Sequence, residues 1–325
     1  MNLSDRRGLD AAARDILANT PNQKRLVLLW AGTSAVLALL TGLISYLLDT
    51  GIAGTGGLSG IGLRSALTTI QQVISTATSI FLPFWGLGYT AVTLGMARRR
   101  NVKEATLLEG FRRFGPGLRL MLLQSLVCGG LFTLCTYGVI LLLAATPLAS
   151  GVYDVLGPVV EQATTDPNWL PDDATVDALT KALLPLTVCG GIVAAAAVLP
   201  LVYRLRLASL RIVDDPRCGA LQAMGLSIRI TRGNAWKLFR LDLYFWWFWL
   251  LEGIILAVTY GDTLLPMIGV TLPISPEVAF WVFYVAAMAL QVAIYAAFHN
   301  RVSVAYALAY DTLLPQENGQ LTMDN

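Results

Sequence analysis

The strongest constraint on this fold is a set of six apolar runs, each about as long as the ~20 residues that an α-helix needs to cross a bilayer. Only 14% of the chain is charged, against ~25% in a typical soluble domain. Too few charges remain to cover a water-facing surface, so the sequence predicts an all-α polytopic membrane protein with six transmembrane helices. The expected spans are 26–48, roughly 74–96, 120–145, 183–202, 238–260 and 278–298.

Charge predicts how these spans are oriented. Of the 23 Lys and Arg residues, all except Arg64 and Lys181 fall in the N-terminal segment, in 98–119, in 204–240 or at Arg301. The loop 147–180, which lies on the other side, is acidic. Because cytoplasmic loops carry an excess of Lys and Arg, we expect both termini to be cytoplasmic.

Three amphipathic surface helices are expected before the first, third and fifth spans. Ser4, Asn101 and Asp215 are the predicted N-caps, since short polar side chains satisfy the first backbone N–H groups. Glu104 would complete a capping box after Asn101, and Pro216 suits a first helical position. The expected apolar faces are Leu9, Ala12, Ala13, Ile16 and Leu17 in the first helix, Leu107, Leu108 and Phe111 in the second, and Leu221, Met224 and Ile228 in the third.

Each surface helix ends at a breaking residue, followed by basic residues and a span. In the third, Gly233 suits a left-handed turn and Asn234 can cap the next helix. We therefore predict one membrane domain, 1–314, built from three hairpin pseudo-repeats at roughly 1–100, 101–214 and 215–314, before a disordered tail at 315–325. The alternative is that any crossing from cytoplasm to membrane uses basic anchors and breakers, so the pattern arises without a repeat.

Two strings carry a resemblance to a known family: SIRITRGNAWKLFRLDLYFWWFWLLEGI and LGYTAVTLGMARRRNVKEATLLEGFRRFG. With a Gly-Asn-x-Trp step, an aromatic span and a Gly-Tyr before a basic stop, they resemble the bacterial membrane family catalogued as domain of unknown function 975. That family is distantly similar to the membrane domain of glycerophosphodiester phosphodiesterases. The resemblance implies a bacterial plasma (inner) membrane location and a fold, and it carries no catalytic residues.

Polar residues inside or beside the spans are the candidate functional residues. Glu252 lies within the fifth span, where an ionisable group is a functional-site hypothesis; the alternative is a hydrogen bond to a neighbouring helix. Asp242 lies near the inner boundary, and an ion pair with Arg204 or Arg206 is its simpler interpretation. His299 and Arg301 end the sixth span and fit polar anchors better than a proton relay.

Two Cys-Gly-Gly steps place Gly129 and Gly190 at similar predicted depths in the third and fourth spans. Small residues let helices approach closely, so we expect these spans to pack there. A metal pair between Cys128 and Cys189 is a weaker alternative.

The sequence contains no phosphate-binding Gly-Lys loop, H-E-x-x-H or nucleophile elbow. We therefore expect a non-enzymatic protein without catalytic, cofactor or metal sites, acting as a scaffold, assembly or envelope-homeostasis factor. Its expected partners are membrane lipids and either a protein partner or further copies of itself, but no nucleic acid. The alternative function is a small transporter or permease for a lipid or amphipathic peptide, with Glu252 and the breaks at Pro83 and Gly233 shaping a cavity.

Overall fold

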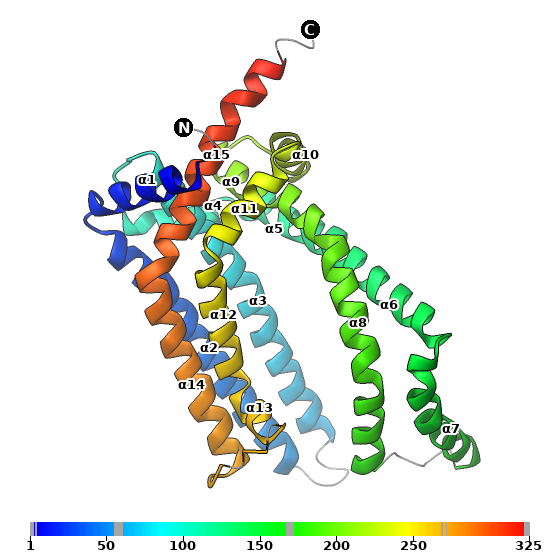
Figure 1. Ribbon diagram of the computed structural model, residues 1–325. Helices are drawn as coiled ribbons and strands as arrows, with labels where there is room; N and C mark the ends of the chain where they lie inside the picture. The colour runs from blue at the N-terminus through cyan, green and yellow to red at the C-terminus, as the bar shows by residue number, and fades with distance from the viewer. Residues whose placement is uncertain are drawn as a thin grey trace. The chain divides into compact units, whose positions relative to one another are not determined.

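The computed structural model describes residues 3, 5–54, 61–166, 172–267, 269–270 and 272–321, and the regular elements within these residues are helical (Figure 1). The chain divides into two compact units. Unit 1 comprises Met1–Leu118 and Leu207–Asn325, and unit 2 comprises Arg119–Arg206. The expected Gly-rich turn at 55–60 lies outside the described residues.

Five helical segments are long and apolar enough to cross a membrane, and a sixth is a pair of helices bent by 68°. The chain is thus a polytopic membrane protein with five to six candidate spans, and the six predicted runs match them to within one residue at the ends where they extend beyond. The predicted orientation, hairpins and threefold repeat stay predictions. The straight segments are Gln23–Leu48, Ser65–Ala97, Phe114–Ala144, Ala174–Asp214 and Pro276–Leu314, and the bent pair is Ala235–Tyr244 with Trp246–Thr259.

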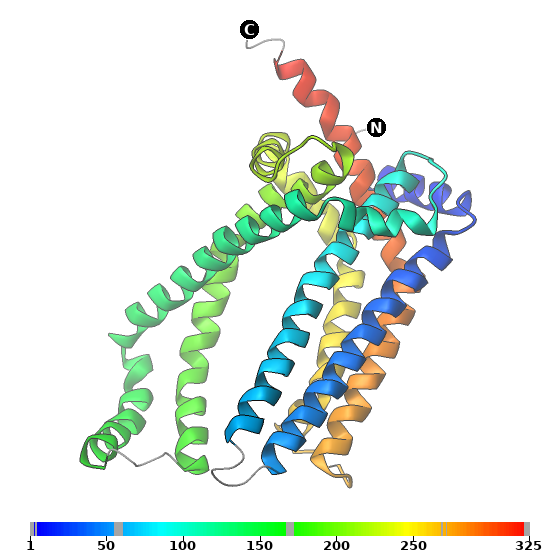
Figure 2. The ribbon, with the colours of Figure 1, turned by 180° about the vertical axis from the view of Figure 1, so that it is seen from behind.

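Unit 1 is built on long helices that pack side by side. α2 packs on α3 and on α14, and α14 packs on α12 (Figures 1 and 2). The elements of these spans are α2 (Gln23–Gly54), α3 (Ile61–Ala97), α11 (Ala235–Tyr244), α12 (Trp246–Thr259), α14 (Pro276–Ile294), the π-helical turn η5 (Tyr295–His299) and α15 (Asn300–Leu321). The short α13 (Gly261–Met267) lies between α12 and α14 in the chain.

Short helices gather at one end of unit 1, which we call its terminal end because α1 and the last turns of α15 (Asn300–Leu321) lie there (Figure 1). α1 packs on α15 and α3, η2 and α4 pack on α3, and α9 packs on α3 and α10. These elements are α1 (Arg6–Ala18), the 3₁₀ helix η2 (Glu104–Leu108), α4 (Glu109–Arg112), α9 (Ala208–Asp214) and α10 (Ala220–Thr231). α5 (Phe114–Gln124) begins in unit 1 and continues into unit 2.

Unit 2 contains α6 packed on α8, with α7 also against α8. Ala149, Val152 and Leu186 form its small buried core. Its remaining elements are the π-helical turn η3 (Ser125–Gly129), α6 (Gly130–Ala144), η4 (Pro147–Ala149), α7 (Ser150–Thr165) and α8 (Asp173–Leu205).

The predicted helix starts needed correction. Ser4 lies outside the described residues, and Asp5 caps α1 by accepting a 2.9 Å hydrogen bond from the Gly8 N–H. The capping box at Asn101 and Glu104 is wrong, because the N-cap of η2 is Lys103 without a side-chain bond. Glu104 instead forms a 2.8 Å ion pair with Arg25.

The third predicted cap is also wrong. Asp215 ends α9 instead of starting α10, and its carboxylate accepts a 2.9 Å hydrogen bond from the Arg217 N–H. The cause is a competing use of Asp, which favours turns as well as caps through bonds to nearby backbone. α10 begins after Gly219.

The face by which α10 packs differs from the prediction. Leu221 and Ile228 are 74% and 38% exposed. α10 buries Ile230 and four smaller residues, and it packs against α9 and α15. Small residues allow close approach, and Leu221 and Ile228 face outward. The predicted face of α1 is confirmed at Leu9, Ala13, Ile16 and Leu17, but Asp10 is buried among them.

Backbone contact between α3 and the η2–α4 segment fixes the terminal end to the spans. A Cβ added at Gly88 would lie 1.8 Å from the Leu107 carbonyl oxygen. One added at Gly110 would lie 1.9 Å from the Phe84 carbonyl oxygen. Only glycine at both positions lets the two backbones touch.

Replacing Gly88 with Ala should therefore destabilise the protein by about 2 kcal/mol or more, as overpacking does. Gly86→Ala is the matched control on the same helix, because a Cβ there meets nothing within 4 Å; it should be neutral or stabilising by up to ~1 kcal/mol. Thermal unfolding of both variants in one detergent measures this. Equal melting temperatures would contradict the contact.

Candidate functional site

A buried carboxylate joins three helices at the terminal end. The side chain of Asp10 on α1 is 1% exposed. It accepts hydrogen bonds from Arg301 on α15 (Nη2 to Oδ2, 2.7 Å), from the Tyr244 hydroxyl at the end of α11 (3.0 Å), and from Arg14 on its own helix. A charge withdrawn from water is stable only when it is paired and hydrogen-bonded. We call these four residues the Asp10 cluster.

The partners of Asp10 also determine its ionisation. Burial alone raises the pKa of this carboxyl, but hydrogen bonds from Arg301, Arg14 and Tyr244 outweigh burial and lower the pKa to about 2. Asp10 is therefore ionised throughout the physiological range. The Arg301 guanidinium also lies 5.7 Å from the centre of the Trp247 ring, within cation–π range.

A second ion-pair cluster follows the end of α3. Arg98 pairs with Asp214 at the end of α9 and with Asp311 on α15 (2.8 Å). The Tyr310 hydroxyl donates a 3.1 Å hydrogen bond to Asp214. We call these residues the Arg98 cluster; like the Asp10 cluster, it uses charge to tie α15 to other segments.

Aromatic rings stack between the spans near the Asp10 cluster. Trp30 on α2 stacks on Tyr89 of α3 at 4.2 Å and on His299 of η5 at 5.0 Å, and His299 stacks on Tyr295 at 4.6 Å. The Tyr89 hydroxyl donates to the Asn300 side chain. His299 thus belongs to a packed aromatic group, and among the described residues its Nδ1 has no hydrogen-bond partner.

Glu252 and His299, both predicted site residues, are connected through one tyrosine. The Tyr295 hydroxyl donates a long, 3.4 Å hydrogen bond to Glu252, while the Tyr295 ring stacks on His299. Glu252 is half-buried and lies on α12 in the bent candidate span. The simpler alternative for Glu252, a bond to a neighbouring helix, matches this geometry.

The other predicted residues lie apart from this group. Asp242 is buried on α11. Arg204 lies in unit 2, so its predicted pair with Asp242 stays a prediction. Gly233 takes the expected left-handed conformation, with φ 76°. Asn234 stands at the N-cap of α11, but its side chain accepts from the Lys237 ammonium (2.8 Å) and not from the backbone.

Gly129 and Gly190, the two glycines predicted to pack the third span on the fourth, differ in how closely the neighbouring helix approaches them. A Cβ at Gly190 on α8 would lie 3.2 Å from the Thr136 carbonyl oxygen of α6, so the helices come close there. Gly129 lies in η3, and a Cβ there would meet nothing within 4 Å. Contact at this level therefore depends on one glycine.

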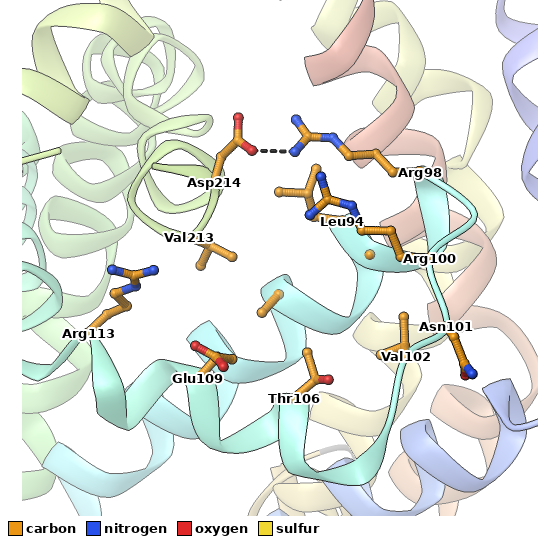
Figure 3. Close-up of a pocket in the computed structure, with 12 residues that line it drawn as sticks. Leu94, Arg98, Arg100, Asn101, Val102, Thr106, Glu109, Arg113, Val213 and Asp214 are labelled. Carbon is orange, nitrogen blue, oxygen red and sulfur yellow. Dashed lines mark hydrogen bonds and ion pairs between the residues drawn. The ribbon is translucent and has the colours of Figure 1, made fainter. Parts of the chain in front are cut away.

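A cavity of about 230 Å³ borders the Arg98 cluster (Figure 3). It lies between the end of α3, the following loop, η2, α4 and the end of α9. The lining residues are Ala91, Leu94, Gly95, Arg98, Arg100, Asn101, Val102, Thr106, Glu109, Arg113, Val213 and Asp214. Within the described part of the chain, no group of three or more His, Cys, Asp or Glu side chains could hold a metal ion.

Neither ion-pair cluster was predicted from the sequence, although Arg301 alone was a candidate residue. A usable local signal existed for Asp10: on a helical wheel it adjoins the apolar face that includes Leu9 and Ala13, and it has Arg14 four residues on. The pairs with Arg301 and Arg98 join residues that are 116 to 291 positions apart, and no local pattern reveals them.

The family model described as "Protein of unknown function (DUF975)" matches residues 1–286. No curated protein and no solved structure matches the chain.

Replacing Asp10 with Asn should destabilise the protein by about 1–3 kcal/mol, because the Arg301 guanidinium loses its bonds to a buried carboxylate. Asp15→Asn is the control on the same helix. Asp15 pairs with Arg99 at 2.7 Å where both side chains are exposed, which should cost at most ~1 kcal/mol. Chemical denaturation in detergent measures the unfolding free energy of both variants. Equal losses of unfolding free energy would contradict a special role for Asp10.

The stabilities of wild type and Asp10→Asn, compared across pH, test the ionisation of Asp10. Because its pKa is lowered to about 2 on folding, from ~3.9 in an unfolded chain, its contribution is present above about pH 4 and is lost as pH falls through 2. The stability difference between wild type and Asp10→Asn should hold from pH 8 to 5 and shrink below 4. A difference independent of pH would mean that the charge is not the cause.

Proposed function

Because the chain belongs to the DUF975 family, whose function is unknown, we propose a role from its own geometry. The protein is a non-enzymatic scaffold of the bacterial plasma membrane, with cytoplasmic termini, that serves as an assembly or envelope-homeostasis factor. Its partners are membrane lipids and a protein partner or further copies of itself.

The observation that carries this proposal is the pair of ion-pair clusters at the terminal end. Asp10 with Arg301, and Arg98 with Asp214 and Asp311, connect the first and last helices of unit 1 to its middle. Charge pairs of this kind, partly withdrawn from water, favour one arrangement of the helices over others. A fixed platform of surface helices on a membrane suits a scaffold.

The outward face of α10 supplies a surface for such a platform. Leu221 and Ile228 point away from the protein, and Trp236 at the start of α11 is 63% exposed. Arg229 and Arg232 lie at the C-terminal end of α10. Apolar side chains beside basic ones fit the interface of an anionic leaflet.

Transport of a lipid or amphipathic peptide is the second candidate. The observation that favours it is Glu252, which lies in the bent candidate span. Among the residues that the structure describes, its side chain accepts only a 3.4 Å hydrogen bond, from Tyr295. Ionisable groups within a membrane commonly mark substrate or proton pathways.

Two variants separate these functions in a bacterium that lacks the native gene and shows a measurable envelope defect, such as detergent sensitivity. For a scaffold, Glu252→Gln should restore wild-type resistance, whereas the double reversal Arg229→Glu with Arg232→Glu should restore little of it. Arg217→Glu, an exposed charge reversal outside α10, is the control and should restore resistance fully.

Immunoblots of membrane fractions must show equal amounts of each variant. Loss of resistance with Glu252→Gln and full resistance with the double reversal would contradict the scaffold and favour transport.

A further inference from the structure

We propose that the cavity beside the Arg98 cluster is a binding site for a phosphate group, carried either by an anionic phospholipid or by a soluble phosphate compound. This goes beyond the proposed function, which names membrane lipids as partners but assigns no site that binds them. The site is formed by Arg100 and Arg113.

Most charges around the cavity are already compensated. Arg98 is paired with Asp214 and Asp311, and Glu109 accepts from Arg112 at 2.7 Å. Neither carboxylate that lines the cavity is therefore left to neutralise a further cation.

Arg100 and Arg113 are the two cations that this leaves. Among the described residues, neither guanidinium has an ion pair. Figure 3 shows them on opposite sides of the cavity, Arg100 on the loop after α3 and Arg113 at the end of α4. Each guanidinium carries five N–H donors, so an anion between them would receive charge-assisted hydrogen bonds from both sides.

A strained turn places Arg100 at the cavity. Arg99 has a φ of 54°, in the left-handed region that favours glycine. The Arg99 N–H bonds to the Met96 carbonyl (2.8 Å) and the Arg100 N–H to the Gly95 carbonyl (2.9 Å), the two bonds of a Schellman turn. The turn leaves Arg98 and Arg100 lining the cavity, while Arg99 pairs with Asp15.

Size and position both favour phosphate. At about 230 Å³, the cavity is smaller than the ~300–1,000 Å³ of pockets for drug-sized ligands, so it suits a small group. Arg matches the geometry of phosphate oxygens with two parallel hydrogen bonds. The candidate span of α3 ends at Ala97, one residue before Arg98, which places the cavity near the depth of lipid headgroups.

The test uses the full chain, purified in a non-ionic detergent. Native mass spectrometry and thermal shift measure binding of phosphatidylglycerol, of phosphatidylcholine, and of inorganic phosphate. We expect phosphatidylglycerol to bind more tightly than phosphatidylcholine. Arg100→Gln with Arg113→Gln should weaken binding by about tenfold or more, since the charge-assisted donors are lost. Arg217→Gln, which removes one exposed charge at the same end, should change it less than about twofold.

The measurement with inorganic phosphate shows whether the bound phosphate group belongs to a lipid or to a soluble compound. Binding of inorganic phosphate that depends on the same two arginines and competes with the lipid supports a soluble compound. Lipid binding that phosphate does not displace supports a headgroup site. Absence of binding by both, or binding that the double variant leaves unchanged, overturns the proposal.

Labelling of wild-type protein provides a measurement that needs no variant. Phenylglyoxal modifies accessible arginines, and phosphatidylglycerol or phosphate should protect Arg100 and Arg113 but not Arg217. Equal modification of all three with and without these ligands would also overturn the proposal.

Discussion

The terminal end of unit 1 depends on one requirement: the Asp10 carboxylate is withdrawn from water and must be paired. Its partners come from α1, from the end of α11 and from the start of α15. To satisfy one charge, the first helix of the chain, the last long helix and the helix before the bend must meet at a single point. Asp10 thereby holds α1 against α11 and α15 within unit 1.

The Arg98 cluster applies the same physics with the opposite sign. Here a cation after α3 is met by carboxylates from α9 and α15. The backbone contact of Gly88 with Leu107 then holds the η2–α4 segment against α3. These contacts occupy the carboxylates that line the small cavity, so the charges of Arg100 and Arg113 have no counter-charge among the described residues. The proposed phosphate site follows from this packing.

Features encoded locally could be predicted from the sequence. The spans, the apolar side of α1 and the left-handed Gly233 each follow from composition, helical period or the freedom of one glycine. Features that depend on a competition between two local structures, or on distant partners, could not be predicted from the sequence. Asp215 ends a helix because Asp suits a turn as well as a cap, and α10 buries Ala220 and Ala223 because close approach outweighs the larger area of Leu221. Gly88 shows its role only when Leu107 is in place. The apolar neighbours of Asp10 and Arg14 give a local signal, but the bond from Arg301 does not.

The coupling between Asp10 and Arg301 tests this account most directly. A double-mutant cycle would compare the unfolding free energies of wild type, Asp10→Ala, Arg301→Ala and the double variant in one detergent. If this pair organises the terminal end, the double variant should be more stable than the sum of the two single losses predicts, by about 1.5 kcal/mol or more. Losses that add to within ~0.5 kcal/mol would show that the two residues act independently, and would contradict the central role of the pair.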